Sequence, residues 1–232
     1  MEVAKSIKNV VAAAIDHAVL KPESTDLELE KEINTIKEYN IASVCVKPCH
    51  VRLSSDILKD SKILVSTVIG FPHGTTTTKC KVTESIEAIE NGAKELDMVI
   101  NIGKLISGDY QYVKNDISEV VKCAHDRNAI VKVIIETALL NEEQKVQACK
   151  IAEQAGADFV KTSTGFNGGG ATLSDIKLMK SAVSSKVKVK ASGGIKTLEN
   201  AIEFIDAGCS RLGTSSTIAI LTDGTSGLDT AY

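Results

Sequence analysis

Short segments rich in Val and Ile alternate along the chain with segments whose apolar residues have helical spacing. Eight Val- and Ile-rich segments can be recognised, around residues 13–17, 42–47, 63–69, 95–101, 130–136, 158–163, 187–191 and 209–213. Alternating strands and helices predict a parallel sheet, because parallel neighbours need a crossover connection. Eight such units in 232 residues predict an α/β fold, a single closed (β/α)8 or TIM barrel. A doubly wound open sheet is the alternative, but no GxGxxG pattern follows the first strand.

Glycine marks the ends of three predicted helices. In "ENGAKELDMVI", "EQAGADFVKTS" and "IDAGCSRLGTS", a helical segment is followed by Gly and then by a strand. The residue after a helix often adopts a positive φ, which costs Gly least, so we expect this conformation at Gly92, Gly156 and Gly208. Capping residues mark the predicted starts, at "TDLE" (25–28), "NEEQ" (141–144), Ser174 and Thr197.

Composition excludes several classes of protein. Hydrophobic residues make up 43% of the chain, enough for an ordinary packed core. The net charge of −3, the 3% of aromatic residues and the absence of Trp argue against a nucleic-acid partner. No apolar run approaches the ~18 residues of a membrane span, and the first residues lack a signal-peptide pattern. Six cysteines without a CxxC pair indicate reduced thiols in a cytoplasmic protein.

Candidate metal ligands are sparse. Cys45, Cys49 and His50 lie close together in sequence, but no second cluster completes a zinc site. The four histidines, at positions 17, 50, 73 and 125, have no spacing that pairs them on one helix or strand. We therefore predict no metal site.

Two lysines occupy unusual positions near the ends of predicted strands. Lys161 follows the apolar segment "AGADFV", and Lys190 lies in "VKVKASGGI". Burying an uncompensated ammonium group costs several kcal/mol, so a lysine in a buried strand needs an explanation. The active site of a (β/α)8 barrel lies at the carboxyl ends of the strands, and neighbouring strands are ~5 Å apart. We therefore expect Lys161 and Lys190, on strands six and seven, to approach each other in one pocket.

A pair of close lysines suits one particular chemistry. A free lysine has a pKa of ~10.4 and is protonated at neutral pH, whereas burial and a neighbouring cation both lower the pKa. The resulting neutral amine can attack a carbonyl group and form a Schiff base. The alternative is that both side chains extend from the barrel mouth into solvent and take no part in chemistry.

Further polar residues interrupt the predicted strands. Asp16 in "AIDHAVL", Asp97 in "ELDMVIN" and Lys132 in "IVKVIIET" are expected to face the same lumen. Carboxylates among lysines can accept and donate the protons of carbinolamine formation and dehydration. Strict alternation also places Lys188 and Glu95 in the lumen, one layer lower. We expect these two side chains to reach the lower mouth or to form pairs.

Glycine-rich segments follow the last three predicted strands. They are "TGFNGGG" (164–170), "SGGI" (192–195) and "GTSS" (213–216). Loops after the seventh and eighth strands of such barrels commonly bind phosphate. Gly allows backbone N–H groups to approach an oxyanion closely, and Ser hydroxyls add donors. These segments therefore predict a phosphate site beside the two lysines.

In order along the chain, between about residues 10 and 216, occur "AIDHAVLKP", "VIGFPHG", "ELDMVINIG", "VIIETALL", "FVKTSTGF", "VKASGGI" and "RLGTSS". Together these motifs resemble the deoxyribose-phosphate aldolase family, whose members are metal-independent class I aldolases. The chain departs from the family pattern at Ala18, where Thr is usual, and at Thr217, where Gly is usual. Ala18 adjoins His17, and Thr217 could slightly alter the phosphate loop, but neither departure threatens the chemistry.

The resemblance implies reversible cleavage of 2-deoxy-D-ribose 5-phosphate to D-glyceraldehyde 3-phosphate and acetaldehyde, in deoxyribose phosphate catabolism. It implies that Lys161 forms the Schiff base, that Lys190 lowers the pKa of Lys161, and that Asp97 relays protons with Lys190. Asp16 and Lys132 would shape the polar pocket. The residues implied for the phosphate are Gly165, Gly193, Gly194, Gly213, Ser215 and Ser216. No metal or other cofactor is implied, because the iminium itself accepts the electrons of the broken C–C bond.

The end of the chain is polar. Residues 222–232, "TDGTSGLDTAY", are rich in Gly, Ser and Thr, so we expect a flexible tail on a single barrel domain that spans 1–232. Such an end is ordinarily frayed and dispensable. The chain nevertheless finishes on Tyr232, as chains of the family often do. The resemblance implies that this phenol enters the barrel mouth and shuttles a proton.

Other functions remain open on sequence alone. Another Schiff-base aldolase or a transaldolase would share Lys161 and differ only in substrate. A class II aldolase would need a metal held by several ligands. A non-catalytic barrel could bind a sugar phosphate without any amine chemistry. The expected partner is a small sugar phosphate rather than nucleic acid or a membrane, and we expect a homo-oligomer, either a dimer or a tetramer.

Overall fold

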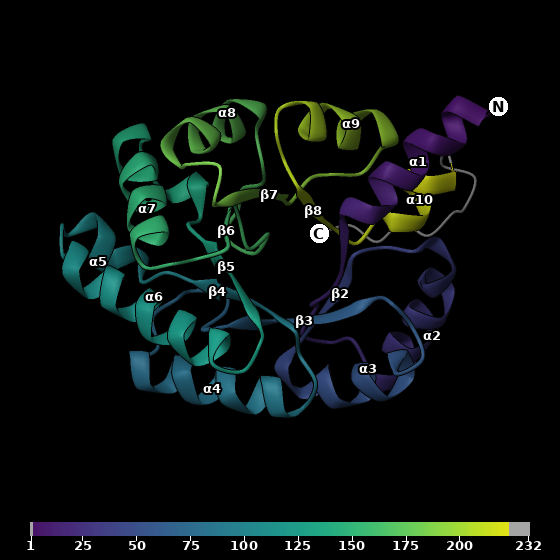
Figure 1. Ribbon diagram of the computed structural model, residues 1–232, viewed down its shortest axis with the longest axis horizontal. Helices are drawn as coiled ribbons and strands as arrows, with labels where there is room; N and C mark the ends of the chain where they lie inside the picture. The colour runs from purple at the N-terminus through teal and green to yellow at the C-terminus, as the bar shows by residue number, and fades with distance from the viewer. Residues whose placement is uncertain (1, 223–232) are drawn as a thin grey trace.

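Eight parallel strands close into a barrel in the order β1-β2-β3-β4-β5-β6-β7-β8. The computed structural model describes residues 2–222, with side chains from residue 6 onward. The strands are β1 Ile15–Val19, β2 Ser43–Val46, β3 Leu64–Ile69, β4 Glu95–Val99, β5 Ile130–Ile134, β6 Phe159–Lys161, β7 Lys188–Ser192 and β8 Arg211–Thr214. Figure 1 shows the strands at the centre of a ring of helices. The predicted α/β fold, a (β/α)8 barrel, is confirmed.

The helices cover the outside of the barrel (Figure 1). They are α1 Glu2–Ala14, α2 Asp26–Ile36, α3 Val51–Leu58, α4 Thr78–Glu90, α5 Ile102–Ile106, α6 Tyr110–His125, α7 Glu142–Gln154, α8 Leu173–Ala182, α9 Leu198–Asp206 and α10 Thr217–Thr222. Short 3-10 helices are η1 Lys37–Tyr39, η2 Pro48–His50 and η3 Thr137–Leu139. Across residues 2–222, none of the helices combines the length and the apolarity needed to span a membrane.

All eight predicted strands are present, with small differences at their ends. The first begins at Ile15, two residues later than predicted, because α1 continues to Ala14. The three alanines at 12–14 favour the helix, since Ala has the highest helix propensity. The predicted glycine conformations are confirmed, with φ of 111° at Gly92, 87° at Gly156 and 108° at Gly208.

Three of the four predicted helix starts are confirmed. Thr25 and Asn141 form capping boxes, and Thr197 accepts from the N–H of Asn200. The prediction for Ser174 is wrong, because the cap of α8 lies two residues earlier, at Thr172, whose hydroxyl accepts from the backbone N–H of Asp175 at 3.1 Å. The Ser174 hydroxyl instead lies 3.0 Å from the hydroxyl of Thr172.

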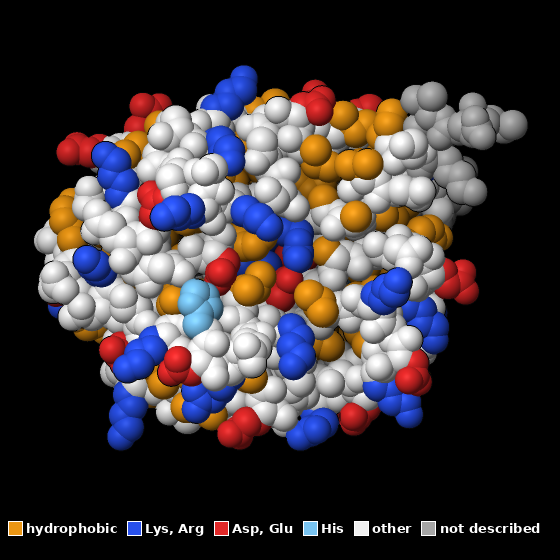
Figure 2. Space-filling model, in the orientation of Figure 1, with side chains coloured by type: hydrophobic (Ala, Val, Ile, Leu, Met, Phe, Trp, Pro, Cys, Tyr) orange, Lys and Arg blue, Asp and Glu red, His pale blue; other side chains and the backbone are white. Residues whose placement is uncertain are grey.

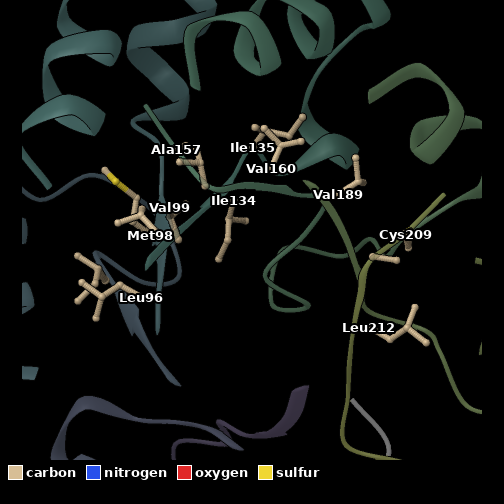
Figure 3. Close-up of a cluster of buried hydrophobic side chains, with 14 of the residues drawn as sticks. Leu96, Met98, Val99, Ile134, Ile135, Ala157, Val160, Val189, Cys209 and Leu212 are labelled. Carbon is tan, nitrogen blue, oxygen red and sulfur yellow. The ribbon is translucent and has the colours of Figure 1, made fainter. Parts of the chain in front are cut away.

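The outer faces of the strands form the main hydrophobic core against the helices. Figure 3 shows side chains of β4 to β8 and of the adjoining loops in this cluster; they include Leu96, Met98, Val160, Val189 and Leu212. Each of these five is completely buried. Because side chains alternate along a strand, their neighbours face the lumen, and several of those neighbours are charged, among them Glu95, Asp97, Lys161, Lys190 and Arg211.

The surface exposed to solvent carries charges of both signs. On the face drawn in Figure 2, Lys and Arg side chains are intermingled with Asp and Glu rather than gathered into one area. All six cysteines are free thiols.

Candidate active site

A connected network of polar side chains fills the lumen, and every strand contributes to it. Its members are Asp16, Ser43, Ser66, Glu95, Asp97, Lys132, Lys161, Lys190 and Arg211, on β1 to β8 in order, with two from β4. All but Arg211 are at most 2% exposed. Lumens of this fold are commonly filled by Val, Ile and Leu, so a polar lumen points to chemistry rather than to packing.

Asp97 is the centre of the network. Its Oδ2 accepts hydrogen bonds from Lys161 Nζ and Lys190 Nζ, each at 2.8 Å, and its Oδ1 accepts from Lys132 Nζ at 2.8 Å. Lys161 and Lys190 are register partners on β6 and β7, so the predicted approach of the two lysines is confirmed. The alternative that both extend into solvent is wrong, because Lys161 is 2% and Lys190 1% exposed.

Asp16 lies on the other side of Lys190. Its Oδ2 is 2.6 Å from Lys190 Nζ and 3.3 Å from Lys132 Nζ, ion pairs whose angles fall outside those of hydrogen bonds. Its Oδ1 accepts a hydrogen bond from the Ser43 hydroxyl at 2.7 Å and another from Arg211. Asp16 therefore joins β1 to β2, β5, β7 and β8.

The two lumen residues left open by the sequence behave differently. Glu95 is buried and pairs with Lys132 at 2.6 Å and with Arg211 at 2.8 Å. Lys188 is exposed, and its ammonium lies 5.6 Å from the ring centre of Phe159. Glu95 thus forms pairs, whereas Lys188 reaches solvent at the amino end of β7; both outcomes were among those expected.

The three lumen lysines differ in the direction of their pKa shifts. Burial lowers the pKa of Lys161; Asp97 opposes the shift, Lys190 adds to it, and the net pKa lies below the usual value. Burial also acts to lower the pKa of Lys190, but Asp16 and Asp97 outweigh it and the pKa is raised. For Lys132 burial is likewise outweighed by Asp16, Asp97 and Glu95, which raise the pKa. Lys161 is thus the lumen lysine best suited to be an uncharged amine.

The two aspartates bonded by the lysines both have lowered pKa values. Burial acts to raise the pKa of Asp97, but Lys132, Lys161 and Lys190 outweigh it and hold the pKa well below the usual range. The pKa of Asp16 is also lowered, because Lys132, Lys190 and Arg211 outweigh burial. A charged acceptor is therefore in contact with the Lys161 amine.

Lys161 and Lys190 open into a pocket at the carboxyl ends of the strands. All six residues predicted for the phosphate line this pocket, namely Gly165, Gly193, Gly194, Gly213, Ser215 and Ser216. Asp16 also lines it, whereas Asp97 and Lys132 do not appear on its wall. Three further lining residues are less polar, namely Ala18, Leu20 and Cys45.

Glycine is required where two loops of the pocket meet. A Cβ at Gly170 would lie 2.6 Å from the carbonyl oxygen of Gly193, closer than real contacts allow. Gly193 itself has φ of 89°, and its carbonyl accepts from the N–H of Ala171 at 3.1 Å. The loops after β6 and β7 are therefore held against each other at the pocket that Lys161 also lines.

The sequence analysis missed several residues of the site. Arg211 shares a strand face with Gly213, so strict alternation could have found it. Lys196 lines the pocket just beyond "SGGI". Glu136 is completely buried, and its carboxylate accepts from the N–H and hydroxyl of Thr164 and from Asn167. No local pattern marks Glu136, because its partners come from a different loop.

Other predictions of the sequence concern metals and the end of the chain. Within residues 2–222, no group of three or more His, Cys, Asp and Glu side chains is arranged to hold a metal ion. Tyr232 and the predicted tail lie outside the described residues, apart from Thr222, which ends α10.

The fold and the site define the chain as a (β/α)8-barrel protein with a buried lysine–carboxylate centre beside a glycine-lined pocket. Residues 10–219 match the family model described as DeoC/LacD family aldolase. The chain belongs to this aldolase family.

Named relatives cover most of the chain. It is 54% identical over 216 residues to a deoxyribose-phosphate aldolase of Thermococcus kodakarensis, covering 92% of this chain and 96% of the relative. It is 52% identical over 212 residues to the enzyme of that name from Thermoanaerobacter, covering 91% and 95%. Among solved structures, a deoxyribose phosphate aldolase of Aeropyrum pernix, described as tetrameric, matches with a TM-score of 0.86 and 28% identity, covering 97% and 98%.

Proposed function

We propose that this chain is a class I aldolase that cleaves 2-deoxy-D-ribose 5-phosphate to D-glyceraldehyde 3-phosphate and acetaldehyde and catalyses the reverse addition. The observation that carries the proposal is a single pocket in which a buried lysine of lowered pKa lies beside glycine and serine loops. Relatives that are 52% and 54% identical to the chain over the aligned residues are named deoxyribose-phosphate aldolase.

In the first step, the Lys161 amine attacks C1 of the open-chain sugar aldehyde and forms a carbinolamine. Nζ loses a proton, and Asp97 Oδ2 lies 2.8 Å from Nζ to accept it. The same oxygen is 2.8 Å from Lys190, whose raised pKa makes it an ammonium able to protonate the departing hydroxyl. Loss of water gives the iminium on Lys161.

In the second step, the C2–C3 bond breaks and its electron pair moves into the iminium, which becomes an enamine. The C3 hydroxyl gives up its proton and becomes the aldehyde of D-glyceraldehyde 3-phosphate; the proton released here balances the one that the enamine takes up at C2. Protonation of the enamine at C2 and addition of one water then release acetaldehyde and restore the amine. The water lost in the first step balances the water consumed here. We assign the proton transfer at C2 to Tyr232, on the family resemblance alone.

The remaining assignments concern binding and charge. Asp16 and Lys132 keep Lys190 and Asp97 in place through the ion pairs described above. Gly165, Gly193, Gly194, Gly213, Ser215 and Ser216 bind the phosphate through backbone N–H groups and hydroxyls, a mode that suits loops leading into helices. No cofactor takes part in these steps.

The decisive experiment is reduction with borohydride in the presence of acetaldehyde, followed by peptide mapping. A two-carbon adduct on Lys161 is expected, together with cleavage of 2-deoxy-D-ribose 5-phosphate. Labelling at Lys190 or Lys132 would reverse the assignment. Trapping without cleavage of this sugar would favour another Schiff-base aldolase or a transaldolase. Phosphate binding without trapping would favour a non-catalytic barrel.

Assembly and location belong to the proposal as well. We propose a homo-oligomer, supported by the tetramer named for the Aeropyrum pernix relative. Sedimentation equilibrium of the full chain would measure the number of subunits. The single domain over residues 1–232 and the cytoplasmic location stay predictions.

A further inference from the structure

The ionisable side chains of the lumen do not balance. The cations are Lys132, Lys161, Lys190 and Arg211, and the carboxylates are Asp16, Glu95 and Asp97. If all seven were ionised, the lumen would contain one more positive than negative charge. An uncompensated charge in a site so nearly closed to water is strongly disfavoured, and removal of one proton makes the lumen neutral.

The contacts indicate which group loses the proton. Among the described ion pairs, Lys161 contacts one carboxylate, Lys190 contacts two and Lys132 contacts three. Arg211 contacts Asp16 and Glu95 and does not deprotonate in proteins. Of the four cationic groups, the ammonium of Lys161 therefore has the least carboxylate stabilisation and loses its proton most easily. Because the lumen has one cation more than it has carboxylates, one lysine becomes an uncharged amine. Arg211 cannot be that group, because it keeps its charge.

We propose that Arg211, through its ion pairs with Asp16 and Glu95, keeps Lys161 an uncharged amine. Arg211 is the first residue of β8 and contacts Oδ1 of Asp16, whereas Lys190 contacts Oδ2. Arg211 does not line the pocket into which Lys161 opens, so it is a positioning residue and not a group that touches the reacting atoms. Arg211 partly neutralises Asp16 and Glu95, and without it the negative charge of these two carboxylates would stabilise the protonated lysines more strongly. The kinetic consequence rests on the proposed function, but the charge of Lys161 does not.

The other groups that face Lys161 do not change this balance. From the elements of the barrel these groups are Asp16 on β1, Cys45 on β2, Glu95 and Asp97 on β4, Lys132 on β5, Lys190 on β7 and Arg211 on β8. Lys196, in the loop after β7, lines the same pocket, but its side chain is exposed and solvent screens its charge. β3 contributes Ser66, which does not titrate. Burial raises the pKa of Cys45, so its thiol stays uncharged at neutral pH. The buried Glu136 is bonded to the loop after β6, at Thr164 and Asn167.

The test is titration of the Lys161 side chain by NMR, with 13C at the ε-carbon of lysine and assignment through Lys161→Met. In Arg211→Met the pKa of Lys161 is expected to rise by about one unit, the effect of a unit charge at roughly 10 Å and an effective dielectric constant of about 20. Glu95→Gln is expected to lower the pKa of Lys161. The double variant, Arg211→Met with Glu95→Gln, again has one cation more than it has carboxylates. The pKa of Lys161 in it should therefore return close to that of the unmodified protein.

Two controls keep the experiment specific. Arg211→Lys retains the charge and should leave the pKa of Lys161 unchanged. Lys188→Met removes a lysine on β7 that is exposed and stacks on the same Phe159 ring as Arg211, so solvent should screen the loss. If Arg211→Met does not fold, Glu95→Gln decides: a lowered pKa supports the proposal and an unchanged one overturns it.

The outcomes for this inference and for the proposed function are separate. A pKa of Lys161 that is the same in the unmodified protein, Arg211→Met and Glu95→Gln overturns the role of Arg211. If the pKa moves as expected but the protein does not cleave 2-deoxy-D-ribose 5-phosphate, the role of Arg211 stands and the proposed function fails. If both hold, the acid limb of kcat/KM in Arg211→Met should move to higher pH by the same amount as the pKa.

Discussion

Replacement of Lys190 by Met is the most direct test of how the site makes a nucleophile. Met keeps an unbranched chain of similar length, and it removes the ammonium that is hydrogen-bonded to Asp97 Oδ2 and 2.6 Å from Asp16. Asp97 would retain Lys132 and Lys161 as partners, and Asp16 would retain Lys132 and Arg211. The perturbation therefore changes the charge near Lys161 without leaving a carboxylate unpaired.

The size of the effect follows from the geometry. Because Lys161 and Lys190 share one oxygen at 2.8 Å each, their ammonium nitrogens are roughly 5 Å apart. At an effective dielectric constant of about 20, two unit charges at that distance repel by about 3 kcal/mol, or about 2 pKa units. The pKa of Lys161 should therefore rise by about 2 units in Lys190→Met, and the ratio of uncharged to protonated amine at a given pH should fall about 100-fold.

The assay is the initial rate of cleavage of 2-deoxy-D-ribose 5-phosphate over a wide pH range, with borohydride trapping measured in parallel. In Lys190→Met both rates should be low at neutral pH and should recover as the pH rises through the new pKa of Lys161. Lys188→Met is the matched control on the same strand and should keep the original profile. A uniform loss at every pH would refute the electrostatic reasoning and leave Lys190 only as a proton donor.

Three further predictions concern phosphate binding, stability and the end of the chain. Ser216→Asp places a negative charge in the pocket and should raise KM for the phosphorylated sugar much more than for 2-deoxyribose; equal losses would place the phosphate elsewhere. Asp116→Asn leaves Lys81, which has no exposed surface, without its carboxylate and should lower the free energy of unfolding by roughly 3–5 kcal/mol in urea titrations, whereas Lys81→Met combined with Asp116→Leu should cost less. Tyr232→Phe should slow turnover and suppress deuterium exchange into the methyl group of acetaldehyde while trapping continues; normal exchange would show that the phenol is dispensable.

The sequence alone determined the fold and the position of its principal lysines. Strand and helix periods depend on local backbone geometry, so eight alternating units were readable without any tertiary information. Once the units were counted, barrel topology made strands six and seven neighbours and so brought Lys161 next to Lys190. The glycine-rich loops followed from the same count, because each loop comes directly after a strand.

Only the tertiary structure decided how the charges pair. Alternation placed Glu95 and Lys188 on lumen faces, but closure of β8 against β1 is what brings Arg211 to Asp16, 195 residues away in sequence. Glu95 pairs with Lys132, whereas Lys188, the first residue of β7, is exposed and takes no part in these ion pairs. The protonation of a buried lysine depends on the distance to every charge around it and on the loss of water. Those quantities exist only after the barrel has closed. The family resemblance named Lys161 as the lysine of lowered pKa, but only the structure supplies the contacts that lower it there and raise the pKa of Lys190.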